Sequence, residues 1–187
     1  MTCIVALQHN GKVYVGGDAS ATCTWSLYSV AGSTPKVFEK DEMIIGSAGS
    51  PREAQIIRHL TTFPRCHPDV DATQHIVATV VECIRSSLRT HGALQVTDNV
   101  ESMESSLIIA FRDQLFDIDV KFSVIQSDRP FTAIGSGRDL ALGSLHTSIA
   151  QPEARVQLAL EAAEAFNAGV RRPFTIRMFG DVDKEAA

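Results

Sequence analysis

The sequence lacks the features that mark membrane, exported and metal-binding proteins. No apolar run approaches the roughly 20 residues that a membrane helix needs, so we expect no membrane partner. The opening MTCIVALQHNGK has no basic stretch, which argues against a signal peptide and predicts a cytoplasmic location. Four cysteines are present, none in a CxxC pair, and their spacings suit no common zinc site. We therefore expect reduced thiols, no metal and no other cofactor.

Several catalytic and nucleotide-binding signatures are also missing. There is no Walker A loop, no GxSxG elbow and no HExxH motif. Gly135-Ser136-Gly137 lacks the third glycine that a dinucleotide-binding loop requires. The net charge of −5 and a pI near 5.6 argue against a nucleic-acid partner.

The composition is that of an ordinary globular protein. Of the 187 residues, 44% are hydrophobic and 21% are charged, which is too apolar for disorder and enough for a sizeable core. The length favours one domain, and no linker, internal repeat or low-complexity segment divides the chain. We expect residues 1–187 to form a single domain.

Local patterns predict the order of the elements. Asn10-Gly11 is a hairpin signal between two strands, and Ser50-Pro51-Arg52-Glu53 has the form of a helix start with a capping box. Strands are predicted over residues 2–8, 13–18, 36–39, 43–47, 106–111, 115–119, 121–125, 131–135 and 174–179, with a further short strand around 25–30. Helices are predicted from residue 51, over 71–91, over 138–149 and over 153–166, and residues 93–103 are predicted to be a polar loop.

This order indicates an α+β fold. Helices do not alternate one-for-one with strands, so a doubly wound parallel sheet is not expected. Hairpins predict antiparallel sheets. Two sheets and two helix pairs fit a four-layer αββα sandwich, with the sheets face to face and the helices outside.

The opening residues suggest a specific chemistry. Thr2 follows the initiator methionine, and a small residue at this position permits removal of that methionine. A threonine hydroxyl needs a base, and a free α-amine with a pKa near 7.7–8.0 can serve as one. Taken alone, position 2 has a simpler interpretation, in which Thr2 is only the first residue of a strand.

Five segments in order resemble one family. TCIVAL, HNGKVYVGGD with ASAT, PKVF, GSAGS before a helix, and AIGSG together resemble the proteasome β-subunit and HslV-like family of N-terminal nucleophile (Ntn) hydrolases. The resemblance spans nearly the whole chain, and the family has the four-layer αββα fold. It implies a threonine peptidase whose nucleophile is exposed when Met1 is removed.

The resemblance also implies a site. Thr2 matches the nucleophile, Asp18 the aspartate at the strand end, and Lys36 the lysine beside the nucleophile. Gly49 matches the glycine whose N–H forms the oxyanion hole, and Ser136 the serine near the α-amine. On the substrate side, Thr22 matches a threonine whose backbone holds extended substrate, and Ser47 matches the floor of the first specificity pocket, which predicts a small, polar pocket.

The match is incomplete in one loop. After its last helix the family often has an aspartate and a serine, and the corresponding stretch here contains Glu164 and Asn167 without a clear register.

The family implies identical subunits in a ring or in stacked rings, an unfolded or peptide substrate, and room for a partner ATPase unfoldase. Helices that look apolar on more than one face point to subunit contacts as well, with Ile76, Val77, Val80 and Val81 in one and Ala159, Ala162 and Ala163 in another. Two alternatives stay open: a non-catalytic structural or assembly protein that kept the fold, and an Ntn amidohydrolase that acts on a small amide.

Overall fold

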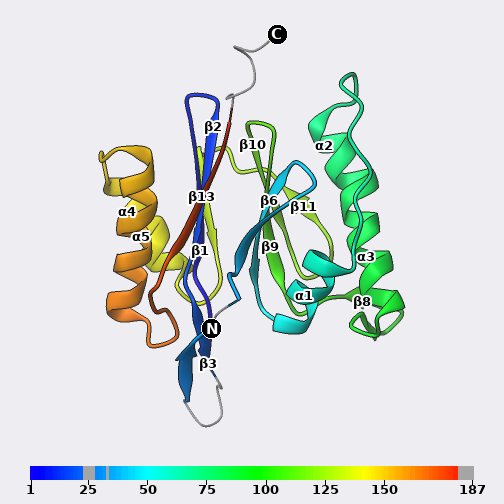
Figure 1. Cartoon of the computed structure of the whole chain (residues 1–187), viewed down its shortest axis with the longest axis horizontal. Helices are drawn as coiled ribbons and strands as arrows, with labels where there is room; N and C mark the ends of the chain where they lie inside the picture. The colour runs from blue at the N-terminus through cyan, green and yellow to red at the C-terminus, as the bar shows by residue number, and fades with distance from the viewer. Residues whose placement is uncertain (23–27, 33, 181–187) are drawn as a thin grey trace.

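Two antiparallel sheets lie face to face in the computed structural model, which describes residues 1–22, 28–32 and 34–180 (Figure 1). The four-stranded sheet has the order β12 (Phe131–Ile134), β1 (Ile4–His9), β2 (Lys12–Gly17) and β13 (Thr175–Gly180). The five-stranded sheet has the order β11 (Val124–Ile125), β10 (Gln114–Ile118), β9 (Ser106–Phe111), β6 (Met43–Ala48) and β5 (Val37–Lys40). Two separate two-stranded ribbons are β3 (Ser20–Thr22) with β4 (Ser29–Ala31), and β7 (Gln95–Thr97) with β8 (Val100–Ser102).

Helices cover the outer face of each sheet (Figure 1). On the four-stranded sheet lie α4 (Arg138–Thr147) and α5 (Pro152–Phe166). On the five-stranded sheet lie α1 (Pro51–His59) and a long helix made of α2 (Ala72–His75), the π-helical turn η1 (Ile76–Val80) and α3 (Val81–Thr90). The predicted mixture of helices with antiparallel sheets is therefore confirmed.

The alternating burial of β1 explains why it lies at the centre. Ile4 and Ala6 pack between the two sheets, whereas Val5 and Leu7 pack against α4 and α5. Both faces are apolar, as a strand covered on both sides requires. The sheets approach so closely that a Cβ added at Gly46 would meet the Ile4 side chain at 2.5 Å.

Two predicted segments differ from the structure. Residues 93–103 contain the β7–β8 hairpin, whose turn residues Asp98 and Asn99 have φ of 50° and 63°. The strand predicted over 121–125 is limited to β11, because Phe122 has a φ of 66° and its N–H donates back to the Asp119 carbonyl. Positive φ values belong to turns rather than strands. Asp and Asn adopt them more readily than most residues, whereas Phe122 gives no such signal in the sequence. The strand predicted around 25–30 lies largely outside the described residues, and β4 begins at its end.

The apolar faces of these helices are mostly buried in the core of the same chain. Ile76, Val80 and Val81 are buried against the five-stranded sheet, and only Val77 of that group is exposed, at 48%. Ala159 and Ala163 are likewise fully buried between α5 and β1. The apolar pattern of these helices is thus mainly a property of the fold, and it adds little to the argument for subunit contacts.

Candidate active site

The β1–β2 hairpin sets Asp18 beside the start of the chain. Antiparallel pairing aligns Ile4 with Gly17, so the next residues outward, Cys3 and Asp18, lie opposite each other. The Cys3 N–H donates to Asp18 Oδ1 at 2.9 Å, and the Ser20 N–H donates to Oδ2 at 2.8 Å. Asp18 is 2% exposed. These two backbone donors hold its carboxylate in one orientation.

Lys36 joins Asp18 to Thr2. It precedes β5 at the edge of the five-stranded sheet, and its Nζ lies 2.9 Å from Asp18 Oδ1 and 3.0 Å from Thr2 Oγ1. Burial lowers the pKa of Lys36 below its ordinary value of 10.5, while the Asp18 carboxylate opposes this shift. A cation this close to the threonine oxygen would stabilise an alkoxide there.

The Met1–Thr2 peptide occupies the same corner. Thr2 Oγ1 donates to the Met1 carbonyl at 2.6 Å, and Lys36 Nζ donates to that carbonyl at 3.2 Å. The Met1 side chain packs on Gly169, where an added Cβ would overlap it. With this peptide bond intact, the nitrogen of Thr2 is an amide and cannot act as a base.

Ser136 faces the Thr2 nitrogen from the other side. Its Oγ accepts from the Thr2 N–H at 3.2 Å and donates to the Thr2 carbonyl at 3.3 Å. Asn167 Nδ2 donates to the Ser136 carbonyl at 2.7 Å, and Asn167 Oδ1 accepts from the Gly169 N–H at 2.9 Å. Asn167 therefore fixes the loop around Ser136. Glu164 instead pairs with Arg172 at 2.8 Å, away from Ser136.

Gly49 lies at the turn that leads into α1. Its φ is 151°, and an added Cβ would come within 2.5 Å of the Ser105 Cα and 2.6 Å of the Glu104 carbonyl. Only glycine fits this backbone and this space. Gly49 is exposed and precedes a helix N-terminus, where free N–H groups favour a negatively charged oxygen.

The capping box predicted at the start of α1 is wrong. Ser50 makes no side-chain cap hydrogen bond. The Glu53 carboxylate turns instead to the next segment and accepts from the backbone N–H groups of Glu104 and Ser105, both at 2.8 Å. Ser105 Oγ in turn accepts from the Ser50 N–H at 3.0 Å. Through these hydrogen bonds, buried Glu53 and Ser105 hold the Gly49–Ser50 turn in position.

A pocket of about 510 Å³ opens in front of these groups. Thr2, Lys36 and Gly49 line it, and Thr22 and Ser47 also contribute to its wall. Ser47 lies on β6 and is 5% exposed, while Thr22 lies on β3 and its hydroxyl is 2.7 Å from that of Ser20. The structure therefore brings five of the predicted residues around one pocket, with Asp18 behind Lys36 and Ser136 behind Thr2. Sequence reasoning missed Glu53 in its bracing role, Ser105 and the position of Asn167.

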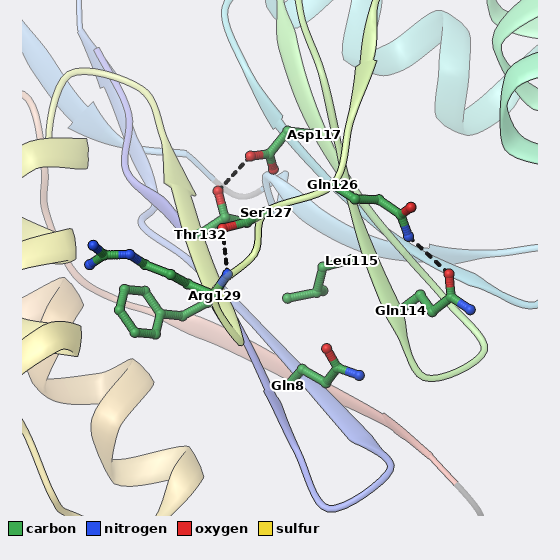
Figure 2. Close-up of a pocket in the computed structure, with 9 residues that line it drawn as sticks. Gln8, Gln114, Leu115, Asp117, Gln126, Ser127, Arg129 and Thr132 are labelled. Carbon is green, nitrogen blue, oxygen red and sulfur yellow. Dashed lines mark hydrogen bonds between the residues drawn. The ribbon is translucent and has the colours of Figure 1, made fainter. Parts of the chain in front are cut away.

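A second, smaller cavity of about 60 Å³ lies near the opposite end of β1 (Figure 2). Gln8 lines it, six residues and about 20 Å along the strand from Thr2. In Figure 2, Asp117 of β10 and Thr132 of β12 meet across the two sheets, with Thr132 Oγ1 donating to Asp117 Oδ2 at 2.6 Å. Burial raises the pKa of Asp117, and the Thr132 hydrogen bond opposes that rise. This pair links the two sheets.

The described ranges can also be compared with the requirements of a metal site and of a membrane span. No group of three His, Cys, Asp or Glu side chains there could hold a metal ion. None of the helices described combines the length and the apolar character required to cross a bilayer.

No protein-family profile matches the chain. The HslV subunit of the ATP-dependent protease of Aquifex aeolicus is 24% identical over 140 residues, which cover 75% of this chain and 73% of that protein. The HslV subunit of Sulfurihydrogenibium sp. is 24% identical over 141 residues, or 75% and 72% of the two chains. The chain is similar to proteasome/HslV-like proteins.

Solved structures share the fold of this HslV-like chain. BPH from Thiobacillus denitrificans is 19% identical with a TM-score of 0.80, and the match covers 95% of this chain and 98% of that one. Eukaryotic HslV from Trypanosoma brucei is 19% identical with a TM-score of 0.69, covering 95% and 99%. The arrangement of helices and sheets is therefore that of the proteasome/HslV-like proteins.

Proposed function

We propose that this chain is a threonine peptidase subunit whose nucleophile is Thr2 after removal of Met1. The observation that carries the proposal is the chain of contacts from Asp18 through Lys36 Nζ to Thr2 Oγ1, with steps of 2.9 Å and 3.0 Å. The two HslV relatives, named as subunits of an ATP-dependent protease, support it. We further propose that residues 1–187 form one domain and that its layers are those of the four-layer Ntn-hydrolase sandwich.

The reaction uses groups that already lie around the pocket. The free α-amine of Thr2 takes the proton from Oγ1, and Oγ1 attacks the carbonyl carbon of a peptide bond. Lys36 stabilises the developing charge on Oγ1, and the Gly49 N–H donates to the oxyanion. The proton then passes to the leaving amine, and an ester to Thr2 remains. Water hydrolyses that ester, which restores the hydroxyl and the amine.

The placement of Ser136 fits this role for the amine. Its Oγ is already 3.2 Å from the Thr2 nitrogen, so it can orient the amine once Met1 is gone. Asn167 holds the Ser136 backbone in place without adding a negative charge beside the amine.

A second candidate is a non-catalytic member of the same fold. It is favoured by the Met1 carbonyl, which receives hydrogen bonds from both Thr2 Oγ1 and Lys36 Nζ. A chain that keeps Met1 would have no terminal base at Thr2.

We propose assembly into a homo-oligomeric ring, supported by the HslV relatives and by exposed apolar side chains on the α4–α5 layer. Leu140 of α4 is 37% exposed, and Leu158 and Phe166 of α5 are 43% and 81% exposed. A single monomeric species in analytical ultracentrifugation at micromolar concentration would refute the ring. A partner ATPase and a cytoplasmic location stay predictions.

The deciding experiment is intact mass spectrometry before and after epoxomicin treatment. We choose this inhibitor because BPH, which shares the fold, was solved in complex with it. We expect the mass of a chain that begins at Thr2, followed by one inhibitor adduct. Thr2→Ala is the matched control and should form none. A retained Met1 with no adduct would favour the non-catalytic candidate.

A further inference from the structure

One face of α1 forms a wall of the pocket. Pro51, Ala54, Gln55 and Arg58 all line it, at positions i, i+3, i+4 and i+7 of the helix. The helix starts beside Gly49, so this wall runs from the proposed oxyanion site toward Arg58. At a rise of 1.5 Å per residue, Arg58 lies about 10 Å along the axis from Pro51, the first residue of the helix. Side chains on a helix lean toward its N-terminus, so Arg58 leans back toward the reacting end.

The charged side chains that the structure describes on the pocket wall are all positive. The chain carries a net charge of −5, yet the residues that line the pocket include Lys36 and Arg58 and no carboxylate. The six residues of 19–35 that are not described, at positions 23–27 and 33, are all uncharged in the sequence. Asp18 pairs with Lys36. Among the described residues, Arg58 has no carboxylate partner, so its charge is free to act on a ligand.

Arg58 is held in place without being neutralised. Its guanidinium lies over the Phe38 ring, 5.5 Å from the ring centre, and Phe38 also lines the pocket. Lys40 Nζ donates to the Arg58 carbonyl at 3.0 Å, which ties the last turn of α1 to β5. Stacking on an aromatic ring restricts the guanidinium and leaves its N–H groups available to bind a carboxylate.

We propose that Arg58 makes this site prefer substrates with an acidic side chain, glutamate above all, on the residue whose carbonyl is attacked. This inference rests on the proposed function of the same pocket. A substrate carbonyl at Gly49 sends its side chain along α1, and the carboxylate of a glutamate then meets the guanidinium. Glutamate is favoured over aspartate because its extra methylene carries the carboxylate further along α1, whose pocket wall extends about 10 Å from Pro51 to Arg58.

The experiment uses fluorogenic tetrapeptides that differ only in the residue before the scissile bond: Glu, Asp, Gln or Lys. With wild-type protein we expect kcat/KM for Glu to exceed that for its isostere Gln by about tenfold, as for a hydrogen-bonded charge pair. Arg58→Gln should bring the Glu-to-Gln ratio close to one. Arg58→Glu should reverse the order and favour Lys.

Arg52→Gln is the matched control. Arg52 lies on the same helix and is exposed, but it does not line the pocket, so its loss should leave the Glu-to-Gln ratio unchanged. Equal ratios in wild type and Arg58→Gln, with epoxomicin still modifying Thr2, would overturn the specificity and leave the proposed function standing.

A binding measurement tests the same inference without turnover. Fluorescence anisotropy would compare labelled tetrapeptide amides ending in Glu or Gln on Thr2→Ala protein. Tighter binding of the Glu peptide, lost in Thr2→Ala/Arg58→Gln, supports the inference even if peptide hydrolysis is absent. Equal binding of the two peptides contradicts it.

Discussion

Lys36 Nζ lies 3.0 Å from Thr2 Oγ1, although 34 positions separate the two residues. The β1–β2 hairpin places Asp18 beside the first strand, and Lys36, which directly precedes β5, reaches Asp18 from the other sheet. Burial and the Asp18 carboxylate act in opposite directions on the pKa of Lys36.

The first prediction concerns the alkaline limb of the pH–rate profile. Activity needs Lys36 charged, so it should fall as the pH rises through the Lys36 pKa, which lies below 10.5. Asp18→Asn removes the carboxylate that opposes the effect of burial, so the alkaline limb should move to lower pH. The measurement is kcat/KM across pH with a fluorogenic peptide. An unchanged alkaline limb in Asp18→Asn would show that Lys36 does not set it.

Thr2 and Lys36 should act as one unit. Either Thr2→Ala or Lys36→Ala should lower kcat by at least about a hundredfold, because each removes a group that acts at the same oxygen. The double variant should be little worse than the worse single variant. Single-turnover assays on all three variants measure this. Additive losses, or full turnover by Thr2→Ala, would contradict the assignment of the nucleophile.

Glu53→Gln should destabilise the fold and impair the turn at Gly49. The carboxylate accepts from two backbone N–H groups, and an amide can replace only one of those contacts while its NH₂ opposes the other. The free energy of unfolding should fall by about 3 kcal/mol in urea titration, with a lower kcat. Exposed Glu104→Gln, next to the same segment, should change it by less than about 0.5 kcal/mol. Equal losses of stability in Glu53→Gln and Glu104→Gln would contradict the role of Glu53 in holding this turn.

Asn167 should support Ser136 through its amide group. Asn167→Ala loses both of its hydrogen bonds, and we expect a stability loss of about 1–2 kcal/mol together with a lower kcat. Asn167→Asp keeps an acceptor for Gly169 but points a carboxylate oxygen at the Ser136 carbonyl. Its stability relative to wild type should therefore recover at low pH, where the acid can donate, and that of the alanine variant should not. If the free energy of unfolding depended on pH in the same way for Asn167→Asp and Asn167→Ala, the proposed support of Ser136 by Asn167 would be contradicted.

Asp117 should make stability depend on pH. Its pKa in the folded state is raised above the ordinary value of 3.8, mainly by burial. The folded protein then holds a proton that the unfolded chain has lost, so stability falls as the pH rises from about 4 through the folded pKa. Asp117→Asn should remove this decline in thermal or urea unfolding across pH. Exposed Asp113→Asn, in the adjacent turn, should follow the wild-type curve.

The sequence alone determined the parts of the protein that depend on neighbouring residues. Asn10-Gly11 defines the first hairpin, because both residues adopt the positive φ values, 50° and 70°, that its turn requires. The alternating apolar residues of β1 and the 3.6-residue period of the helices place the core faces. Matching these segments to known motifs also brought Thr2, Asp18, Lys36 and Gly49 to one site before any contact was seen.

Only the tertiary structure decided which partner each polar group takes. Glu53 has the sequence position of a capping residue, but packing of α1 on the five-stranded sheet presents it with two unpaired N–H groups at Glu104 and Ser105, which it binds instead. The sequence did not show whether Asn167 or Glu164 would support Ser136. In the structure Asn167 donates to the Ser136 carbonyl, and Glu164 pairs with Arg172. Periodicity and turn residues act over a few positions and can be read from the chain. Hydrogen-bond partners separated by 31 or 52 residues are chosen only when the sheets and helices have packed.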